Sequence, residues 1–402
     1  MKVLVNFSPA FDIIVVYQPI RRKQMNDNTK IDLHNVTTSD EALDIIETSV
    51  KTLINNPTLA HSLPAIMLRG APGVGKSSIV KEIADRLGIG FIDVRLSQLE
   101  RVDFCGLPSV DDHVTEWNVP AFWPRDKKSK GILLLDEITS APADVQVAAY
   151  QLVLDRKISN SNYELPDGWY VIAAGNRTID RAVVKTMSSA LANRFMHFEI
   201  EANAEDWRGW AVKHDINPSV TGFIQFRPQL LFKMDNQNLE MGWPSPRSWE
   251  KVSNVLSLFG HNEEVLRKVV YGLVGPSAGV EFMEFHHTAK KFDDVLEMMT
   301  NPKAKIVIPT KADEKCAFAA ACSYLLWNGK SEKDDKQRVS GLYRILDNMT
   351  SDFCVMLIKA AMLGNTRVNR MTAIKLIMGD KAYAAFAKKH AKAFADRHSL
   401  DK

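Results

Sequence analysis

The sequence has little cysteine and no long apolar run. Its four cysteines are Cys105, Cys316, Cys322 and Cys354. None forms a C-x-x-C pair or stands at zinc-site spacing with paired histidines, so neither a disulfide framework nor a zinc site is predicted. We expect reduced, mostly buried thiols in a cytoplasmic protein. A membrane-spanning helix needs about 18 or more consecutive apolar residues, and the sequence contains no such run, so no membrane insertion is predicted.

The chain also lacks an excess of charge of one sign. Lys and Arg number 51 and Asp and Glu 48, which gives a net charge of +3 and disfavours a nucleic-acid binder that works by bulk electrostatics. Residues 1–20 are apolar only in patches, broken by Pro9 and Asp12, and no small-residue cleavage site follows, so we expect no secretory signal. Whether Met25 is the true start stays open.

The 402 residues have ordinary globular composition, 46% hydrophobic and 25% charged, and their number predicts two or three domains. Five short apolar runs read as strands, with helical patterns between several of them. Strands that are apolar on both faces and alternate with helices predict an α/β fold, a parallel sheet flanked by helices. The five runs are Ala65–Arg69, Phe91–Arg95, Gly131–Leu135, Trp169–Ala174 and Met196–Ile200.

Beyond about residue 203 the apolar residues recur at helical spacing, which predicts an all-α domain and then a helical C-terminal region. A run of five charged residues within 328–337 is expected to be solvated and to interrupt the helices. The predicted division is an N-terminal extension open to disorder at 1–38, a core at 39–202, a helical domain at 203–300, a linker at 301–310, and a helical region at 311–402.

A glycine-rich motif follows the first predicted strand and precedes an amphipathic helix. It fits G-x-x-x-x-G-K-[ST] at every fixed position, the phosphate-binding loop of P-loop NTPases. Glycines let successive backbone N–H groups cradle phosphate oxygens, Lys76 reaches the β- and γ-phosphates, and the Ser77 hydroxyl binds Mg²⁺. ATP and Mg²⁺ are therefore the predicted ligands. The predicted nucleotide-binding residues are Gly70, Ala71, Pro72, Gly73, Val74, Gly75, Lys76, Ser77 and Ser78.

Two carboxylates, Asp136 and Glu137, end the third predicted strand. The carboxyl ends of parallel strands line one crevice, so both side chains should emerge beside the bound phosphates. Hydrolysis needs one carboxylate for Mg²⁺ and a second to polarise the attacking water. We assign these roles to Asp136, with Ser77 as the other metal ligand, and to Glu137, respectively.

These motifs and those that follow them resemble the AAA+ ATPases and, within them, the MoxR branch. The similarity covers roughly residues 40–300. It implies a P-loop ATPase core followed by an all-α lid domain. The similar stretches are Asp136–Pro142 with the downstream Asp155-Arg156, the strand Val171–Asn176, Ala190–Phe195 and Trp243–Arg247.

The resemblance implies three further catalytic residues. Asn176 corresponds to the sensor-1 residue that positions the lytic water, and Arg247 to sensor 2 at the start of a lid helix. Arg194 corresponds to the arginine finger that acts on a neighbouring subunit, although Arg177 and Arg181 compete for that role. Whether Arg247 acts in its own subunit or across an interface stays open.

The resemblance also implies a homo-oligomeric ring, most simply a hexamer, that uses ATP to remodel a protein client in a chaperone-like way. That client is plausibly a protein with a von Willebrand factor A domain. The alternative is a nucleic-acid translocase or loader, which the small net charge and the lack of a DNA- or RNA-reading signature disfavour. Two segments are candidate contacts with the client: residues 311–402, and Trp117–Trp123, whose aromatics can equally be packed core.

Overall fold

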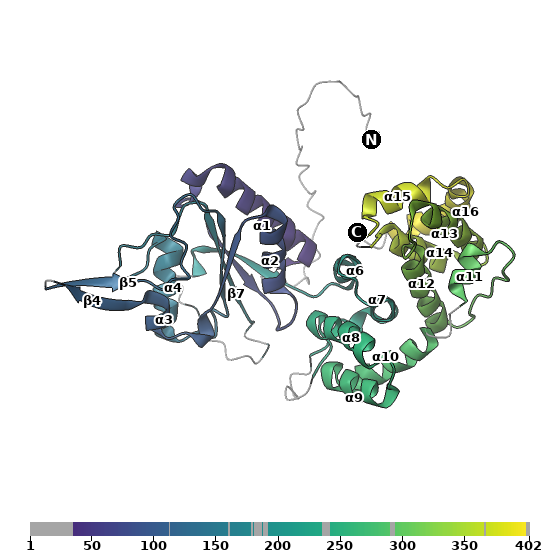
Figure 1. The fold of residues 1–402 in the computed structure, drawn as a ribbon, viewed down its shortest axis with the longest axis horizontal. Coiled ribbons are helices and arrows are strands. Elements are labelled where there is room, and N and C mark those ends of the chain that lie inside the picture. Colours follow the sequence, from purple (N-terminus) through teal and green to yellow (C-terminus); the bar gives the residue numbers. More distant parts are fainter. Residues whose placement is uncertain are drawn as a thin grey trace, which may run out of the picture. The chain divides into compact units, whose positions relative to one another are not determined.

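The computed structural model describes residues 35–111, 113–159, 161–177, 180, 187, 192–234, 242–289, 294–365 and 367–398. Most of the predicted N-terminal extension, and with it Met25, lies outside these residues. Figure 1 shows the sheet with its flanking helices, and the helices that follow it in the sequence.

Six parallel strands form the central sheet in the order β1-β8-β2-β7-β6-β3. Their bounds are β1 Val36–Thr37, β2 Ala65–Arg69, β3 Gly90–Arg95, β6 Gly131–Asp136, β7 Trp169–Gly175 and β8 Phe195–Ile200. All five predicted strands are confirmed to within one residue at either end. β1 was not predicted, because two residues carry no periodic pattern and the strand forms only by pairing with β8. The predicted parallel α/β fold of the P-loop NTPase class is confirmed.

Both faces of the sheet are covered by apolar contacts. Helices α1 (Ser39–Asn55) and α2 (Lys76–Leu87) pack on one face, where Ile66 and Leu134 are buried. Helix α4 (Ala143–Asp155) packs on the other, against Met67 and Leu135. Side chains alternate between the faces of a strand, so a sheet buried on both sides requires strands that are apolar throughout.

A two-stranded hairpin, β4 (Leu107–Asp111) and β5 (Val114–Asn118), extends outward from the core (Figure 1). It follows the short helix α3 (Arg101–Cys105). Val110 and Val114 near its tip are 75% and 60% exposed. By contrast Trp123, in the aromatic segment that follows, is 1% exposed and packs edge-on against Phe104 at 5.0 Å between ring centroids. That tryptophan is therefore core, whereas Phe122 beside it is 39% exposed and the hairpin carries the more exposed valines.

The helices after the sheet begin with a group that shares one core, which buries Phe223, Trp249 and Phe282. These helices are α6 Ala204–Lys213, α7 Pro218–Phe226, α8 Pro246–Phe259, α9 Glu263–Val274 and α10 Pro276–Ala289. The next group is α11 Val295–Thr300, α12 Ala312–Leu326, α13 Glu332–Leu346, α14 Ser351–Met362, α15 Arg370–Met378 and α16 Tyr383–His398. Residues 301–310 contain no helix or strand.

The helices are interrupted within 328–337 as predicted, but only at 328–331, and the charged run itself is helical. Helix α13 begins at Glu332, after an N-cap in which the Ser331 side chain accepts from the backbone N–H of Asp334. Acidic residues in a first turn are stabilised by the helix dipole, so this composition starts a helix. Nor is the run fully solvated, because Asp335 is 2% exposed and pairs with Arg367 at 2.5 Å.

Candidate functional site

The glycine-rich loop connects β2 to α2 at the carboxyl edge of the sheet. Gly73 and Gly75 have φ angles of +83° and +101°, in the left-handed region where a side chain would be strained. Gly70 has no room for a side chain either, since an added Cβ would lie 2.7 Å from the carbonyl oxygen of Ile200. The glycines of the motif are therefore required by the backbone path of the loop.

Lys76 is buried at the first position of α2, with 8% of its surface exposed. Its ammonium Nζ donates to the carbonyl oxygens of Gly70 at 2.8 Å and Ala71 at 3.1 Å, and to Oδ1 of Asn176 at 3.3 Å. Burial lowers the pKa of Lys76 to about 8, while the carboxylates of Asp136 and Asp180 oppose that shift. The loop thus holds a cation that is poorly solvated and satisfied by neutral acceptors.

Ser77 and Asp136 meet beside this lysine. The Ser77 hydroxyl donates to Oδ2 of Asp136 at 2.6 Å, although 58 residues separate the two in the sequence. A hydroxyl and a carboxylate are hard oxygen donors of the kind that Mg²⁺ prefers, and Mg²⁺ commonly takes only one or two protein ligands beside substrate phosphates. The pair fits a magnesium site.

Glu137 has a partner that the sequence did not reveal. The Ser97 hydroxyl hydrogen-bonds to Oε2 of Glu137. Ser97 belongs to a short 3₁₀ turn that directly follows β3, the neighbour of the strand that ends at Asp136. Its place just beyond the carboxyl end of an adjacent strand is the signal that could have identified it. Glu137 itself has φ +57°, an uncommon conformation for a non-glycine residue.

The end of β7 brings Asn176 to the same edge. Its side chain reaches Lys76, and its backbone N–H donates to the Thr139 hydroxyl at 3.2 Å. Gly175 makes this approach possible, because a Cβ there would lie 2.6 Å from the Thr139 side chain. Asn176 is therefore fixed between the phosphate loop and the segment after the acidic pair.

The three arginines considered for a finger role are placed differently. Arg177 is held within its own chain, with Nη2 donating to Asp180 at 2.8 Å and Nη1 to Glu199 at 3.1 Å, and these carboxylates raise the pKa of its guanidinium. Arg194 is half-buried in the turn before β8 and is not among the described residues that line the site cavity. Arg181 lies outside the described residues.

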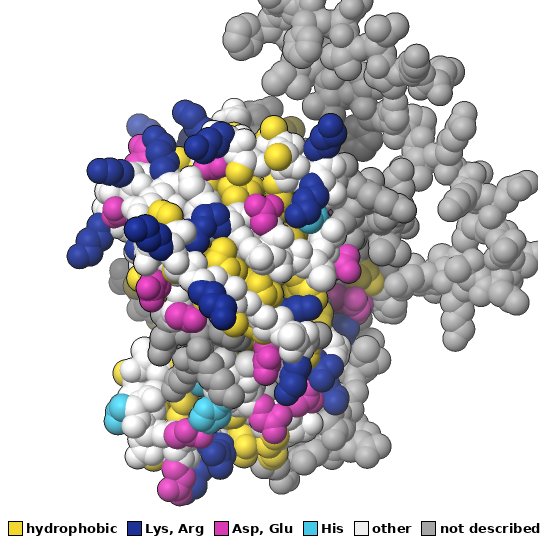
Figure 2. All heavy atoms as spheres, turned by 90° about the vertical axis from the view of Figure 1, so that its right-hand side faces the viewer, with side chains coloured by type: hydrophobic (Ala, Val, Ile, Leu, Met, Phe, Trp, Pro, Cys, Tyr) yellow, Lys and Arg dark blue, Asp and Glu magenta, His cyan; other side chains and the backbone are white. Residues whose placement is uncertain are grey.

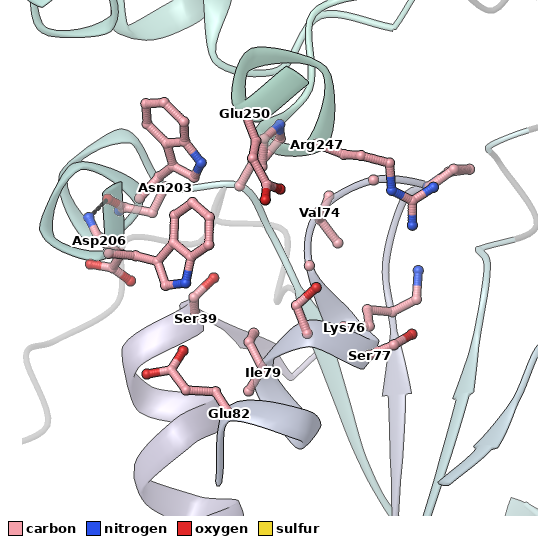
Figure 3. Close-up of a pocket in the computed structure, with 18 of the residues that line it drawn as sticks. Ser39, Val74, Lys76, Ser77, Ile79, Glu82, Asn203, Asp206, Arg247 and Glu250 are labelled. Carbon is pink, nitrogen blue, oxygen red and sulfur yellow. Dashed lines mark hydrogen bonds between the residues drawn. The ribbon is translucent and has the colours of Figure 1, made fainter. Parts of the chain in front are cut away.

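Helix α8 approaches the phosphate loop directly. Its N-cap is Ser245, and the backbone N–H of Arg247 donates to the carbonyl oxygen of Gly73 at 3.3 Å. A Cβ on Gly73 would lie 3.0 Å from the Ser245 hydroxyl, so the close approach again depends on glycine. The structure therefore brings Arg247 to the site within one chain, as Figure 3 shows.

A cavity of about 200 Å³ joins these groups. It runs from the phosphate loop, Asp136, Glu137 and Asn176 to side chains of α1, α2 and α6 (Figure 3). The end of the cavity at α1, α2 and α6 was not predicted from the sequence. Its lining includes Ser39, Asp40, Leu43, Ile79, Glu82, Asn203, Asp206, Trp207 and Trp210.

Comparison with known families matches residues 65–195 to the AAA domain of the dynein-related subfamily. The chain carries a AAA domain. The match spans about a third of the chain, from β2 to the first residue of β8, and includes the phosphate loop, the acidic pair and Asn176. No curated protein matches the sequence.

Solved structures similar to this chain include RuvB of Thermotoga maritima, a Holliday junction branch migration motor. It is 14% identical, with 71% of this chain and 84% of that chain covered and a TM-score of 0.32. NtrX of Brucella abortus is 15% identical, with 54% of this chain and 51% of that chain covered and a TM-score of 0.31.

The AAA domain supports nucleotide binding and ATPase activity in general. The resemblance to AAA+ ATPases is thus confirmed at the level of the AAA domain and its fold, while the MoxR assignment stays a proposal. In the part of the chain that the structure describes, no helix is both long enough and apolar enough to cross a membrane. All four cysteines are buried, and none of them is in a disulfide.

Proposed function

We propose that this chain binds ATP in the cavity and hydrolyses it, as the motor of a MoxR-like ring that remodels a protein partner. One observation carries the proposal. The start of α2 and the ends of β6 and β7 bring Lys76, the Ser77–Asp136 pair, Glu137 and Asn176 together at one edge of the sheet. A loop lysine, a metal-ligand pair, a candidate base and a polar positioning group are the parts that nucleotide hydrolysis requires.

Binding begins with Lys76. The backbone carbonyls that now accept from its ammonium are neutral, whereas β- and γ-phosphate oxygens carry charge, so a bound triphosphate is the stronger acceptor. Ser77 and Asp136 would hold Mg²⁺, which neutralises charge on the transferred phosphoryl group. Asn176, already within reach of Lys76, would orient the lytic water.

Glu137 must leave Ser97 to act on water. While the Ser97 hydroxyl donates to the carboxylate, one carboxylate oxygen is engaged and is not available to accept from a water. Rotation away from Ser97 would free the carboxylate to take a proton from the attacking water as a general base. In this scheme Ser97 restrains hydrolysis until the site is loaded.

The lowered pKa of Lys76 gives a pH dependence. In the empty site Lys76 loses its proton as the pH rises through about 8, whereas bound phosphates would raise its pKa and hold the proton. ATP affinity should therefore fall above pH 8, by at most about tenfold per pH unit. Calorimetry at pH 8.5 in two buffers of different ionisation enthalpy should show proton uptake on binding. No uptake at that pH would contradict a pKa near 8.

We propose a homo-oligomeric ring, most simply a hexamer, in which Arg194 of one subunit completes the site of its neighbour. Arg194 does not line the cavity of its own chain, so any action on phosphate would be exerted on another subunit. Arg177 is ion-paired within its own chain with Asp180 and Glu199, and it stays the alternative. Arg247, beside the loop in the same chain, is assigned to sensing nucleotide in its own subunit.

Mixed rings test the trans role. Arg194→Ala chains keep an intact pocket, and Lys76→Ala chains keep an intact finger, so each is expected to be inactive alone. A 1:1 mixture should recover about a quarter of the unmodified rate, since half the pockets are intact and half of those gain an intact finger. A mixture of Lys76→Ala with Glu137→Gln is the control and should stay inactive. Rings shown to be mixed that recover nothing would exclude Arg194.

For the client we propose a separate protein, of which one with a von Willebrand factor A domain is the first candidate. We propose that this client contacts the exposed valines at the tip of the β4–β5 hairpin. Residues 311–402 are the second candidate surface. The face in Figure 2 carries described Lys and Arg side chains interspersed with acidic and hydrophobic ones. A phosphate backbone is usually bound along a stripe of one sign, which this face does not present. With a net charge of only +3 for the whole chain, we favour a protein client over a nucleic acid.

ATPase stimulation separates these two classes. Casein, as a permanently unfolded protein, and single-stranded DNA are added to the full chain. We expect casein alone to raise phosphate release, and Val110→Asp to remove that increase while leaving the basal rate. Thr58→Asp, which adds the same charge at an exposed position outside the hairpin, is the control. Stimulation by DNA alone would favour the translocase.

Deletion of residues 311–402 would be a poor test of the second surface. Cys316 and Ala317 of α12 are buried in the core formed with α7 and α8, so the deletion opens that core to water. Point substitutions on exposed side chains of the C-terminal helices avoid this damage.

A further inference from the structure

A second cavity lies among the helices that follow the sheet. It has a volume of about 80 Å³ and is formed by side chains of α6, α7, α12 and α14 and of the turns that follow α6 and α14. Helices α7 and α12 pack closely beside it, since a Cβ on Gly222 would lie 2.4 Å from the Ala320 side chain. This cavity shares none of its described lining residues with the nucleotide cavity. It therefore takes no part in the chemistry at the phosphate loop.

The cation of this cavity is Arg208, a half-buried side chain of α6. Its Nη2 donates to Oε1 of Gln225 at 2.8 Å, a neutral acceptor, and it forms no ion pair with any described residue. Burial lowers the pKa of the Arg208 guanidinium, and the carboxylate of Glu205 opposes that shift. A charge withdrawn from water without a counter-charge is unfavourable, so a negatively charged ligand would stabilise this arrangement.

Two neutral side chains of the lining, Ser323 and Gln225, have hydrogen bonds left to donate. The Ser323 Oγ is buried, and no described residue donates to it or accepts from it. A buried hydroxyl without a partner costs free energy, which a ligand in the cavity would recover. Gln225 uses its amide oxygen on Arg208, which leaves the amide N–H groups as donors. A guanidinium, an amide and a hydroxyl together suit the oxygens of one anion.

The size and the walls of the cavity favour a small carboxylate as that anion. A water molecule needs about 10–15 Å³ of such volume, so the cavity holds a ligand of about five to eight non-hydrogen atoms. Val212, Ile216 and Leu363 form an apolar wall, which suits the aliphatic part of an organic acid better than a hydrated inorganic anion. Asp215 is the one carboxylate among the described lining residues, and its charge disfavours a second negative charge on the ligand.

We infer that this cavity binds a small aliphatic monocarboxylate, with its carboxylate on Arg208, Gln225 and Ser323 and its aliphatic part on the apolar wall. Arg208 and Gln225 come from α6 and α7, and Ser323 from α12, so the ligand joins the group of helices after the sheet to the group that follows it. The inference is independent of the proposed function, because the two cavities have separate linings.

Propionate is the probe, and its binding to the full chain is measured by saturation-transfer NMR. We expect a Kd of about millimolar, as befits a ligand with so few atoms, and no binding of propionamide, which keeps the shape without the charge. Arg208→Gln should weaken propionate binding by about tenfold or more. Ser323→Ala removes a hydroxyl with no described partner, so it should fold normally and weaken binding by about threefold to tenfold. Arg267→Gln, which removes an exposed guanidinium on α9, is the control and should change nothing.

Each result decides the inference. No binding of propionate, or equal binding of propionate and propionamide, would overturn it. Propionate binding that is unchanged in Arg208→Gln and Ser323→Ala would place the acid elsewhere and overturn the site. Inorganic phosphate that binds more tightly than propionate, and is lost in Arg208→Gln, would overturn the choice of a carboxylate. If Arg208→Gln does not fold, Arg208→Lys, which keeps the charge without the planar fork, makes the same comparison beside Ser323→Ala.

Discussion

Lys76→Ala should abolish measurable ATP binding at micromolar concentrations. The substitution removes a buried cation whose charge the phosphates need, at a cost of about 3 kcal/mol or more, or about 100-fold in Kd. The remaining backbone N–H groups of the loop are too few to compensate. Equilibrium binding of a fluorescent ATP analogue to the purified variant measures the loss.

The matched control for this variant is Lys81→Ala. Lys81 lies on the same helix, α2, but is exposed and does not line the cavity. It should bind ATP as the unmodified chain does. If Lys76→Ala folds, as judged by circular dichroism, and still binds within threefold of the control, the phosphate loop is not the nucleotide site.

Glu137→Gln should bind ATP normally and hydrolyse it about 100- to 10,000-fold more slowly, the usual range for loss of a general base. Glutamine keeps the size of the side chain and can still accept from the Ser97 hydroxyl, so the site should keep its shape. Phosphate release under single-turnover conditions separates this loss from slow product release.

Two controls accompany Glu137→Gln. Glu264→Gln alters an exposed carboxylate on α9, whose ion pair with Lys268 contributes little, and should leave the rate unchanged. Ser97→Ala frees Glu137 and should hydrolyse ATP at least as fast as the unmodified chain. A normal rate in Glu137→Gln would remove it as the base, and a stalled Ser97→Ala would show that Ser97 assists hydrolysis instead of restraining it.

Much of this account could be predicted from the sequence because its signals are local. The phosphate loop is a contiguous motif, and the apolar runs of the strands are short and uninterrupted. The carboxyl-edge rule then predicted that Asp136 and Glu137 would emerge beside the phosphate loop, and Asp136 does contact Ser77 of that loop. Each of these predictions needs only the local pattern and the parallel topology.

The remaining features depend on contacts between distant segments. Ser97 binds Glu137, and α6 brings Trp210 to the cavity, but neither residue carries a motif of its own. The charged neighbours of Asp335 in the sequence predicted that it would be solvated. In the structure Asp335 is buried and forms an ion pair with Arg367. Periodicity cannot reveal a partner that lies tens of residues away.

The most direct test of the central claim is phosphate release by the purified full chain with ATP, in Mg²⁺ and then in EDTA. The account predicts turnover that requires Mg²⁺, disappears in Lys76→Ala and Glu137→Gln, and persists in Lys81→Ala and Glu264→Gln. Turnover that is the same in all four variants would show that hydrolysis occurs elsewhere or comes from a contaminant. ATP bound at the loop without turnover, at every protein concentration tried, would contradict the assignment of this chain as an ATPase.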